Sequence, residues 1–376
     1  MQIYCEDSLL YAREFFADWG QLHFFSGRTV TPSQLKDADI LLVRSTTRVD
    51  AEMLSHCPNL KYVGTATAGT NHLDIQALKS RGIAYGSAAG CNAIAVAEYV
   101  VSALFALAQT QGWQLLDKQV GIVGAGHVGS QLHNKLSALG IRTLLCDPPL
   151  AAQGDKRTIV DMDAIMACDI ISLHVPLVEQ GPYSTRGLFG PQRLAQLSDN
   201  QVLINACRGE VVDNQALLAL YRQGRKFTTV LDVWENEPDI LTDLLPYVAL
   251  ASAHIAGHTL EGKARGTWML YQQVGELLSL PVELPLEAVL PDPELAAMTI
   301  DEVEQAQLAK LVFGVYDIRQ DDQLFKTQVS QPGQFEYIRK HYAIRREFAA
   351  LQVSAGNSVL KKAICGLGFA SKAANS

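Results

Sequence analysis

Short apolar runs alternate with longer helical patterns from the N-terminus to about residue 255, and this alternation constrains the fold more than any other feature. It is typical of βαβ units, in which helices join parallel strands. A first series of strand candidates covers residues 3–5, 22–25, 40–43, 62–64 and 83–85, with helical patterns at 9–19 and 73–79 between them. A second series covers 120–123, 143–146, 170–173, 202–205, 229–232 and 248–252. The sequence therefore predicts an α/β protein, whose second series makes a doubly wound nucleotide-binding domain.

Two features divide the chain further. The apolar stretch 93–108 contains Glu98 and is too short to cross a bilayer, so we expect a buried helix there. After a helical pattern at 259–280, four prolines break the pattern and mark a domain boundary; they are Pro281, Pro285, Pro291 and Pro293. The C-terminal part that follows has mixed signals, including an apolar run at 308–316 and a charged, helix-like run at 335–348.

The composition excludes several classes of partner. The 376 residues are 48% hydrophobic and 19% charged, with a formal net charge of -8, so neither nucleic acid nor an anionic membrane is an expected partner. The seven cysteines are scattered and form no Cys-x-x-Cys pair, and the N-terminus lacks the features of a secretory signal. We predict a cytoplasmic protein. No metal site is expected, because His72 and His174 lack ligand spacing with other donors.

A glycine loop follows the strand candidate at 120–123 and precedes a helical pattern. Gly124, Gly126 and Gly129 form the Gly-x-Gly-x-x-Gly pattern, with His127 and Val128 between the last two. This pattern lets a cofactor diphosphate approach the backbone at the helix N-terminus. The next strand candidate ends at Asp147, placed to accept hydrogen bonds from the adenosine ribose. No arginine stands beside it to receive a 2′-phosphate, so we predict NAD rather than NADP.

Three candidate catalytic residues follow successive strand candidates in the same domain. They are Arg208, Glu237 and His254. Oxidation of a 2-hydroxy acid needs a cation for the carboxylate and a base for the hydroxyl proton. Arg208 offers a planar fork for the carboxylate, His254 can carry the proton, and Glu237 would orient the imidazole and stabilise its protonated form.

The segments around these residues, 205–213, 231–238 and 254–257, together with the glycine loop, resemble the D-isomer-specific 2-hydroxyacid dehydrogenases. The resemblance covers about the first 280 residues and implies Arg208, Glu237 and His254 as the catalytic triad. It implies a flavodoxin-like, discontinuous substrate domain at 1–93 and 257–280, an NAD-binding domain at 94–256, and a C-terminal α+β dimerisation domain at 281–376. A cleft closing about hinges near 92–95 and Gly257 would then exclude water.

The resemblance also implies further site residues and a partner. Ser45 and Thr67 would contact a small phosphorylated hydroxy acid, with His258 at a further contact position, and the enzyme would be a homodimer. Apart from the resemblance, an anionic substrate needs local cations in an acidic protein, so Arg44 is a candidate substrate contact. His258 stands where close relatives carry Tyr, and Val175 stands where the wider family often carries Thr. The residues implied at the NAD site are Val175, Ala206, Cys207, Arg208, Asp232 and Gly257, with Cys207 as a small packing residue rather than a nucleophile.

Several alternatives remain open at this point. The loop containing Arg44, Ser45 and Arg48 either binds substrate anions or is an ordinary solvated turn. Arg345 and Arg346, on the charged run 335–348, either reach the active site of a partner subunit or form surface or interface ion pairs. The substrate could be another acid, such as 3-phosphoglycerate or glyoxylate, and the chain could instead be a non-catalytic NAD(H)-sensing protein.

Overall fold

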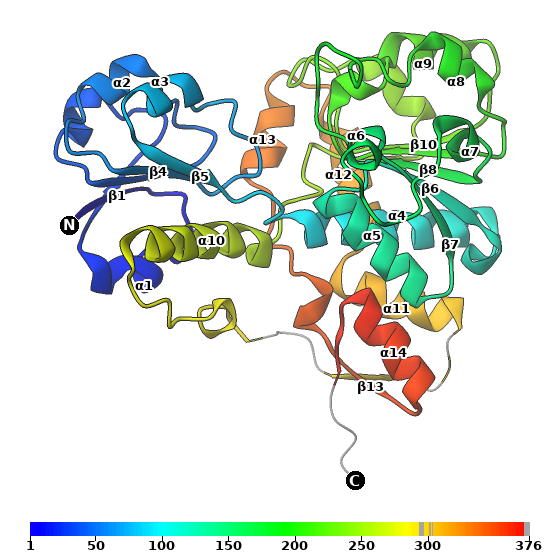
Figure 1. Ribbon diagram of the computed structural model, residues 1–376. Coiled ribbons are helices and arrows are strands. Elements are labelled where there is room, and N and C mark those ends of the chain that lie inside the picture. Colours follow the sequence, from blue (N-terminus) through cyan, green and yellow to red (C-terminus); the bar gives the residue numbers. More distant parts are fainter. Residues whose placement is uncertain (293–296, 301, 303, 372–376) are drawn as a thin grey trace. The chain divides into compact units, whose positions relative to one another are not determined.

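The computed structural model describes residues 1–292, 297–300, 302 and 304–371 (Figure 1). Two compact units are present, and each combines two stretches of the chain. The first unit contains Met1–Asn92 and Thr259–Asp292, and the second contains Ala93–His258 and Pro293–Ser376. By contact the C-terminal segment therefore groups with the segment that carries the glycine loop. The division into three domains stays a prediction.

The first unit is built on a five-stranded parallel sheet of order β2-β1-β3-β4-β5. This is the flavodoxin-like order, as predicted. Alternate side chains of the buried strand β3 point to opposite faces: Ile40 and Leu42 pack with α1 and α10, whereas Leu41 and Val43 pack with α2 and α3. The elements are β1 (Gln2–Glu6), α1 (Ala12–Phe16), β2 (Gln21–Phe25), β3 (Ile40–Val43), α2 (Ala51–Ser55), β4 (Tyr62–Thr65), α3 (Ile75–Ser80), β5 (Ala84–Ser87) and α10 (Leu260–Leu278).

The second unit contains a six-stranded parallel sheet of order β11-β10-β9-β8-β6-β7. Beyond β7 the next segment makes only an isolated parallel bridge, Leu145 to Ile159, so a third strand on that side is reduced to one residue pair. Helices α4 and α5 cover one face of the sheet, and α7, α8 and α9 cover the other. The elements are β6 (Gln119–Val123), α5 (His127–Ala138), β7 (Arg142–Cys146), α6 (Pro148–Ala152), α7 (Met162–Met166), β8 (Ile170–Leu173), α8 (Pro191–Gln196), β9 (Val202–Asn205), α9 (Asn214–Arg222), β10 (Thr228–Leu231) and β11 (Leu250–Ala251).

The apolar stretch after residue 92 forms helix α4 (Ala93–Gln111), as expected for a core helix. Its 19 residues are long and apolar enough to cross a membrane by length and composition, so the expectation that the helix is too short is wrong. The helix instead lies against the sheet and α5, and 83% of its apolar window is buried inside the protein. It is the central helix of the second unit.

The C-terminal segment is predicted as α+β, but its three described strands are all parallel, in the order β12-β13-β14, so α/β describes it better. The apolar run 308–316 is helical as far as Val315. The charged run 335–348 is not one helix: α13 ends at Lys340, and Arg345 lies in an irregular stretch with 5% of its surface exposed. Arg345 is therefore not a surface residue. The elements are β12 (Met298–Ile300), α11 (Gln305–Val315), α12 (Ile318–Gln328), α13 (Gln334–Lys340), β13 (Gln352–Ala355), α14 (Ser358–Leu367) and β14 (Ala370–Ser371).

Candidate active site

The topology of the second unit gathers the predicted chemistry at one edge of its sheet. Because all six strands are parallel, their carboxyl ends meet at the same edge, where open α/β sheets bind ligands. The loop after β6 carries the glycines, and the loops after β9, β10 and β11 carry Arg208, Glu237 and His254. Strands β9, β10 and β11 are neighbours, so the three polar residues follow three adjacent strands.

The glycine loop has the geometry that a cofactor diphosphate requires. Gly124 has φ +94°, and a Cβ there would lie 2.4 Å from the carbonyl oxygen of His174, so only glycine fits this turn. A Cβ on Gly126 would meet no protein atom within 4 Å. Gly126 is also the N-cap of α5, and no side chain among the described residues caps that helix. The helix N-terminus thus has room and backbone donors for an anion, and these residues fit NAD.

The predicted adenosine end of the site is more constrained than its sequence indicates. The Asp147 carboxylate accepts hydrogen bonds from the backbone N–H groups of Ala125, at 2.8 Å, and Leu150, at 3.1 Å, so it ties the glycine loop to α6. Arg157 donates to the Ala125 carbonyl and the Ser130 hydroxyl. Sequence spacing missed this arginine, which lies after the predicted strand. Its charge is already paired with Asp155 at 2.7 Å, which agrees with NAD rather than NADP.

Glu237 and His254 form a tight pair. The Nδ1 atom of His254 lies 2.7 Å from Oε2 of Glu237, and Oε1 of Glu237 accepts the backbone N–H of Trp234 at 2.9 Å. The His254 side chain is 28% exposed and the Glu237 side chain is 20% exposed, so both are partly shielded from water. With Nδ1 held by the carboxylate, Nε2 is the ring nitrogen that a substrate can reach.

The loop that carries His254 is fixed by a buried carboxylate. His254 has φ +56°, a left-handed conformation that is uncommon for a residue with a Cβ. Asp232, 1% exposed, accepts hydrogen bonds from the Ser252 hydroxyl and from the backbone N–H groups of Ile255 and Ala256. The Asp232 carboxylate thus organises the histidine loop, and its predicted place at the NAD site stays a prediction.

Arg208 follows β9 at the same edge and is exposed. Its guanidinium donates to the Cys207 carbonyl at 2.6 Å, and its own carbonyl accepts from the Asn205 side chain at 2.9 Å. The next residue, Gly209, packs against the loop of Glu237: a Cβ there would lie 1.8 Å from the Trp234 carbonyl oxygen. Two of the three loops are therefore in direct contact.

Two neighbouring side chains are unsuited to catalysis. Burial raises the pKa of the Cys207 thiol to about 11, so the thiolate that a nucleophile needs is not formed near neutral pH. Burial lowers the pKa of His174 to about 3, which keeps this imidazole neutral, and its Nε2 contacts the Ser172 hydroxyl at 2.8 Å. Both residues pack at the edge where Val175, Ala206 and Gly257 also lie, in the loops after β8, β9 and β11. Among the described residues, no cluster of three or more His, Cys, Asp or Glu side chains could hold a metal ion.

The predicted substrate contacts lie in two different units. Arg44 and Ser45 follow β3 and Thr67 follows β4, all in the first unit, whereas His258 belongs to the second. The ring of His258 lies edge-on to Tyr342, with the ring centres 6.1 Å apart. Thr67 donates its hydroxyl hydrogen bond to the Gly69 carbonyl at 2.9 Å.

A buried glutamate that sequence reasoning missed shapes the loop after β3. Glu6, at the end of β1, accepts hydrogen bonds from the hydroxyls of Ser8, Thr46 and Thr47 and from the Arg44 backbone N–H. Burial alone would raise the pKa of this carboxyl, but the four hydrogen bonds together lower it. Glu6 is therefore held as a carboxylate that fixes the backbone on either side of Ser45. No local pattern marks Glu6, because three of its four partners lie in the loop after β3, about forty residues along the chain.

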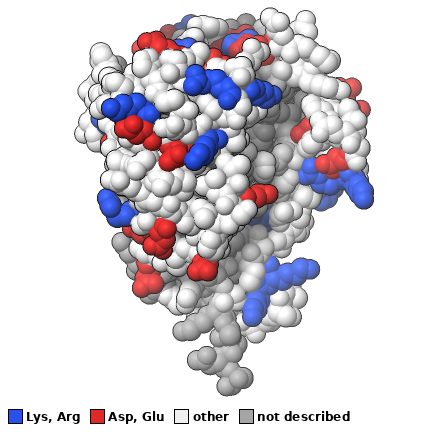
Figure 2. All heavy atoms as spheres, turned by 60° about the vertical axis from the view of Figure 1, so that its left-hand side comes forward, with Lys and Arg blue, Asp and Glu red and all other residues white. Residues whose placement is uncertain are grey.

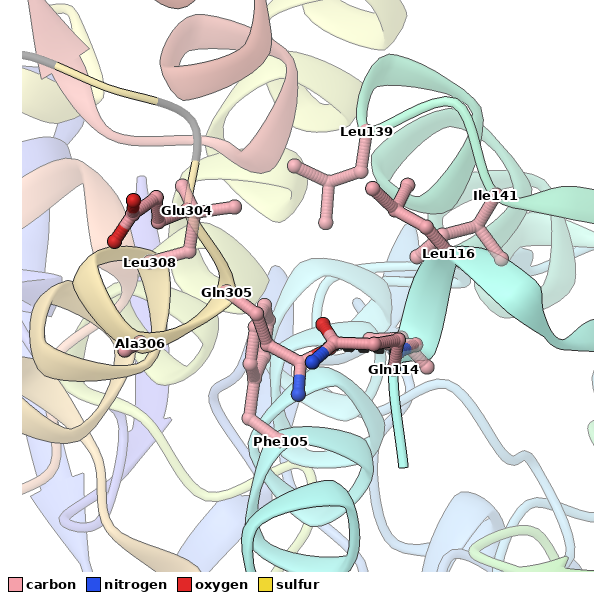
Figure 3. Close-up of a pocket in the computed structure, with 10 residues that line it drawn as sticks. Phe105, Gln114, Leu116, Leu139, Ile141, Glu304, Gln305, Ala306 and Leu308 are labelled. Carbon is pink, nitrogen blue, oxygen red and sulfur yellow. Dashed lines mark hydrogen bonds between the residues drawn. The ribbon is translucent and has the colours of Figure 1, made fainter. Parts of the chain in front are cut away.

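A separate cavity of about 340 Å³ lies away from this edge (Figure 3). Its apolar walls include Phe105 of α4, Leu308 of α11 and Leu139, which follows α5. Gln305 closes one side: its side chain accepts the Leu115 N–H and donates to the Trp113 carbonyl. It contains none of the predicted site residues.

Comparison with known proteins agrees with this geometry. Residues 92–259 match the family model "D-isomer specific 2-hydroxyacid dehydrogenase, NAD binding domain". Residues 289–368 match a "Domain of unknown function (DUF3410)". An erythronate-4-phosphate dehydrogenase from Pseudoalteromonas atlantica is 61% identical over 98% of this chain and 99% of its own length. This chain belongs to the erythronate-4-phosphate dehydrogenases. Another erythronate-4-phosphate dehydrogenase, from Psychromonas ingrahamii, is 45% identical over 100% of this chain and 98% of its own length.

Solved structures show the fold at greater distance. A D-lactate dehydrogenase from Aquifex aeolicus, complexed with NAD and lactic acid, has a TM-score of 0.55 at 22% identity, covering 74% of this chain and 96% of that chain. An NAD⁺-bound 3-phosphoglycerate dehydrogenase from Entamoeba histolytica has a TM-score of 0.61 at 22% identity, covering 74% of this chain and 95% of that chain. The chain is an NAD-dependent 2-hydroxyacid dehydrogenase, as predicted.

Proposed function

We propose that this enzyme oxidises 4-phosphoerythronate at C2 to the 2-oxo acid with NAD, as a step in pyridoxal 5′-phosphate biosynthesis. The observation that carries the proposal is the 61% identity to an erythronate-4-phosphate dehydrogenase along essentially the whole of both chains. The Glu237–His254 pair and Arg208 on adjacent loops supply the groups that the reaction needs.

In the proposed reaction the guanidinium of Arg208 grips the substrate carboxylate and polarises the oxygen on C2. Nε2 of His254 takes the proton of the C2 hydroxyl as the C–O bond becomes a carbonyl. Glu237 holds the ring through Nδ1 and stabilises the imidazolium that forms. NAD, bound at the glycine loop, supplies the acceptor for the hydride that leaves C2.

The substrate phosphate needs local cations, since the protein is acidic overall. On the face shown in Figure 2, Lys and Arg side chains are interspersed with Asp and Glu rather than gathered in one field. We assign substrate contacts to Ser45, Thr67, Arg44 and His258. In the first unit, burial and the charge of Arg44 lower the pKa of Lys263, which indicates that two cations lie near each other there.

We also propose that the enzyme is a homodimer and that it works in the cytoplasm. All seven cysteines are free thiols and six of them are buried, which suits a reducing compartment.

The test is NADH formation from 4-phosphoerythronate, with a carbonyl trap that removes the product. 3-Phosphoglycerate and glycerate serve as comparison acids, and Arg208→Ala is the inactive control. Turnover of 4-phosphoerythronate alone, lost in the control, supports the proposal. Preferred turnover of 3-phosphoglycerate would keep the chemistry and reject the substrate. Tight NADH binding without turnover of any acid would favour an NAD(H)-sensing protein instead.

A further inference from the structure

The guanidinium of Arg345 is buried in the second unit and bonds two backbone carbonyls that are far apart in the sequence. Nη2 donates to the Ala95 carbonyl at 2.7 Å, and Nη1 donates to the Ala256 carbonyl at 3.1 Å. The guanidinium carbon also lies 3.7 Å from the centre of the Tyr316 ring, a close cation–π contact. One side chain of the C-terminal segment thus connects the start of α4 with the loop of His254.

The polar groups around Arg345 extend this connection. Tyr316 and Tyr342 both donate hydroxyl hydrogen bonds to Oδ2 of Asp321, at 2.7 and 2.8 Å. Tyr342 in turn lies edge-on to His258. Arg345 is therefore held in place by a buried framework that belongs entirely to the C-terminal segment. A rigid framework of this kind can impose a position on the loop that it touches.

Helix α4 offers further docking points along the same face. Ala95, Glu98 and Ser102 are spaced at i, i+3 and i+7, so they share one side of the helix. Glu98 accepts the Phe348 backbone N–H at 2.9 Å, and the Ser102 hydroxyl donates to the Tyr316 carbonyl at 2.9 Å. The C-terminal segment is thus anchored to α4 at three points, and at Arg345 the contact continues to Ala256.

The two carbonyls occupy informative positions. Ala256 is two residues beyond His254, and its own N–H is held by Asp232. Ala95 and Ala256 also lie close to the points at which the chain passes between the two units, since the second unit begins at Ala93 and its first stretch ends at His258. Arg345 therefore fixes the backbone where the histidine loop ends and where α4 begins.

We propose that Arg345 is a positioning residue for the active site, through which the C-terminal segment holds the His254 loop in its own subunit. The proposal rests on the proposed role of His254 as the proton acceptor. Arg345 itself touches no reacting atom. Loss of its fork releases the Ala256 carbonyl, so the histidine loop gains freedom while the glycine loop, on the far side of β8 and β9, keeps its structure.

The test compares Arg345→Met, Arg345→Lys and a control, Arg339→Met. Methionine fills the space without hydrogen bonds, and lysine keeps the charge but lacks the planar fork that reaches both carbonyls. Arg339 is an exposed arginine of α13 in the same segment. Amide hydrogen exchange at Ile255 and Ala256 reports the loop directly, and exchange in β6 and β8 reports the fold. Steady-state kinetics and NADH binding by fluorescence complete the comparison.

We expect Arg345→Met to speed exchange at Ile255 and Ala256 by about tenfold or more, and to lower kcat by about 10- to 100-fold. In Arg345→Met, NADH affinity and exchange in β6 and β8 should match those of the Arg339→Met control. Arg345→Lys should be intermediate in exchange at Ile255 and Ala256 and in kcat. Equal exchange and equal kcat in all three proteins would overturn the proposal, as would a uniform rise in exchange across the sheet. If Arg345→Met does not fold, Arg345→Lys carries the same comparison.

Failure of the proposed function gives a different result. If the unmodified enzyme turns over no 2-hydroxy acid, the catalytic assignment fails, whereas the exchange data still decide whether Arg345 holds the His254 loop.

Discussion

Nδ1 of His254 lies 2.7 Å from one carboxylate oxygen of Glu237, and the other oxygen of that carboxylate accepts the Trp234 backbone N–H. The carboxylate is thus fixed from both sides and cannot rotate away without breaking a hydrogen bond. A fixed partner sets which nitrogen of the imidazole faces the substrate. The geometry therefore connects a backbone contact in one loop with the orientation of the proposed proton acceptor in another.

Replacing Glu237 by Gln should lower kcat by about 10²- to 10⁴-fold, the range typical of acid–base groups. The amide keeps the shape of the side chain but removes the charge that stabilises the imidazolium. NADH formation under saturating substrate measures the effect. Asp239→Asn, which removes an exposed carboxylate from the same loop, is the matched control and should retain kcat. Similar losses in both variants would argue against a specific role for Glu237.

Replacing Arg208 by Lys should lower kcat/KM by about 100-fold, because lysine keeps the charge but loses the two-pronged grip on a carboxylate. The dependence of rate on substrate concentration gives this value. Arg222→Lys, at an exposed arginine that pairs with Asp243, should have no effect. An Arg208→Lys enzyme with unchanged kcat/KM would show that the substrate carboxylate binds elsewhere.

Two glycine substitutions in one loop should separate cofactor binding from folding. Gly126→Ala adds a methyl group where no protein atom lies within 4 Å, so the melting temperature should hold while NADH affinity falls at least about tenfold. Gly129→Ala places a Cβ 1.9 Å from the Gly124 carbonyl oxygen, so it should lower both the melting temperature and the NADH affinity. Thermal unfolding and NADH titration distinguish them. Unchanged affinity in Gly126→Ala would mean that no diphosphate approaches there.

A buried carboxyl in α4 should make stability depend on pH. Burial, with a further contribution from Glu347, raises the pKa of Glu98 from 4.5 to about 7, despite its contact with Lys135 at 3.0 Å. Between these two values the folded state binds the proton and the unfolded state does not, so stability falls as pH rises from about 4.5 to about 7.

Urea unfolding at pH 5 and pH 8 tests this dependence. The wild type should lose on the order of 1–3 kcal/mol relative to Glu98→Gln over that interval, because the variant has no carboxyl to ionise. A constant difference between the two proteins at both pH values would contradict the prediction.

The sequence predicted the two parallel sheets because their strands are short and apolar, and the inner strands β3, β4, β8 and β9 are buried on both faces, which leaves a clear local pattern. It also predicted that Arg208, Glu237 and His254 each follow a strand, which the structure shows, whereas their catalytic role stays a prediction. It could not predict that Arg345 is buried, because its hydrogen-bond partners are the carbonyls of Ala95 and Ala256, far along the chain. The roles of Glu6 and Arg157 were missed for the same reason: their partners come from other elements.

Helix α10 covers the face of the first sheet formed by Ile3, Ile40 and Tyr62, yet it belongs to the second stretch of that unit. On the ribosome, the strands of this sheet emerge first, and residues Ala93–His258 of the second unit follow them. Helix α10, which covers the sheet, emerges only after those residues. An apolar surface therefore stays open while most of the polypeptide is still being made. Synthesis of this enzyme thus passes through a period in which the nascent chain is exposed to aggregation and to capture by chaperones.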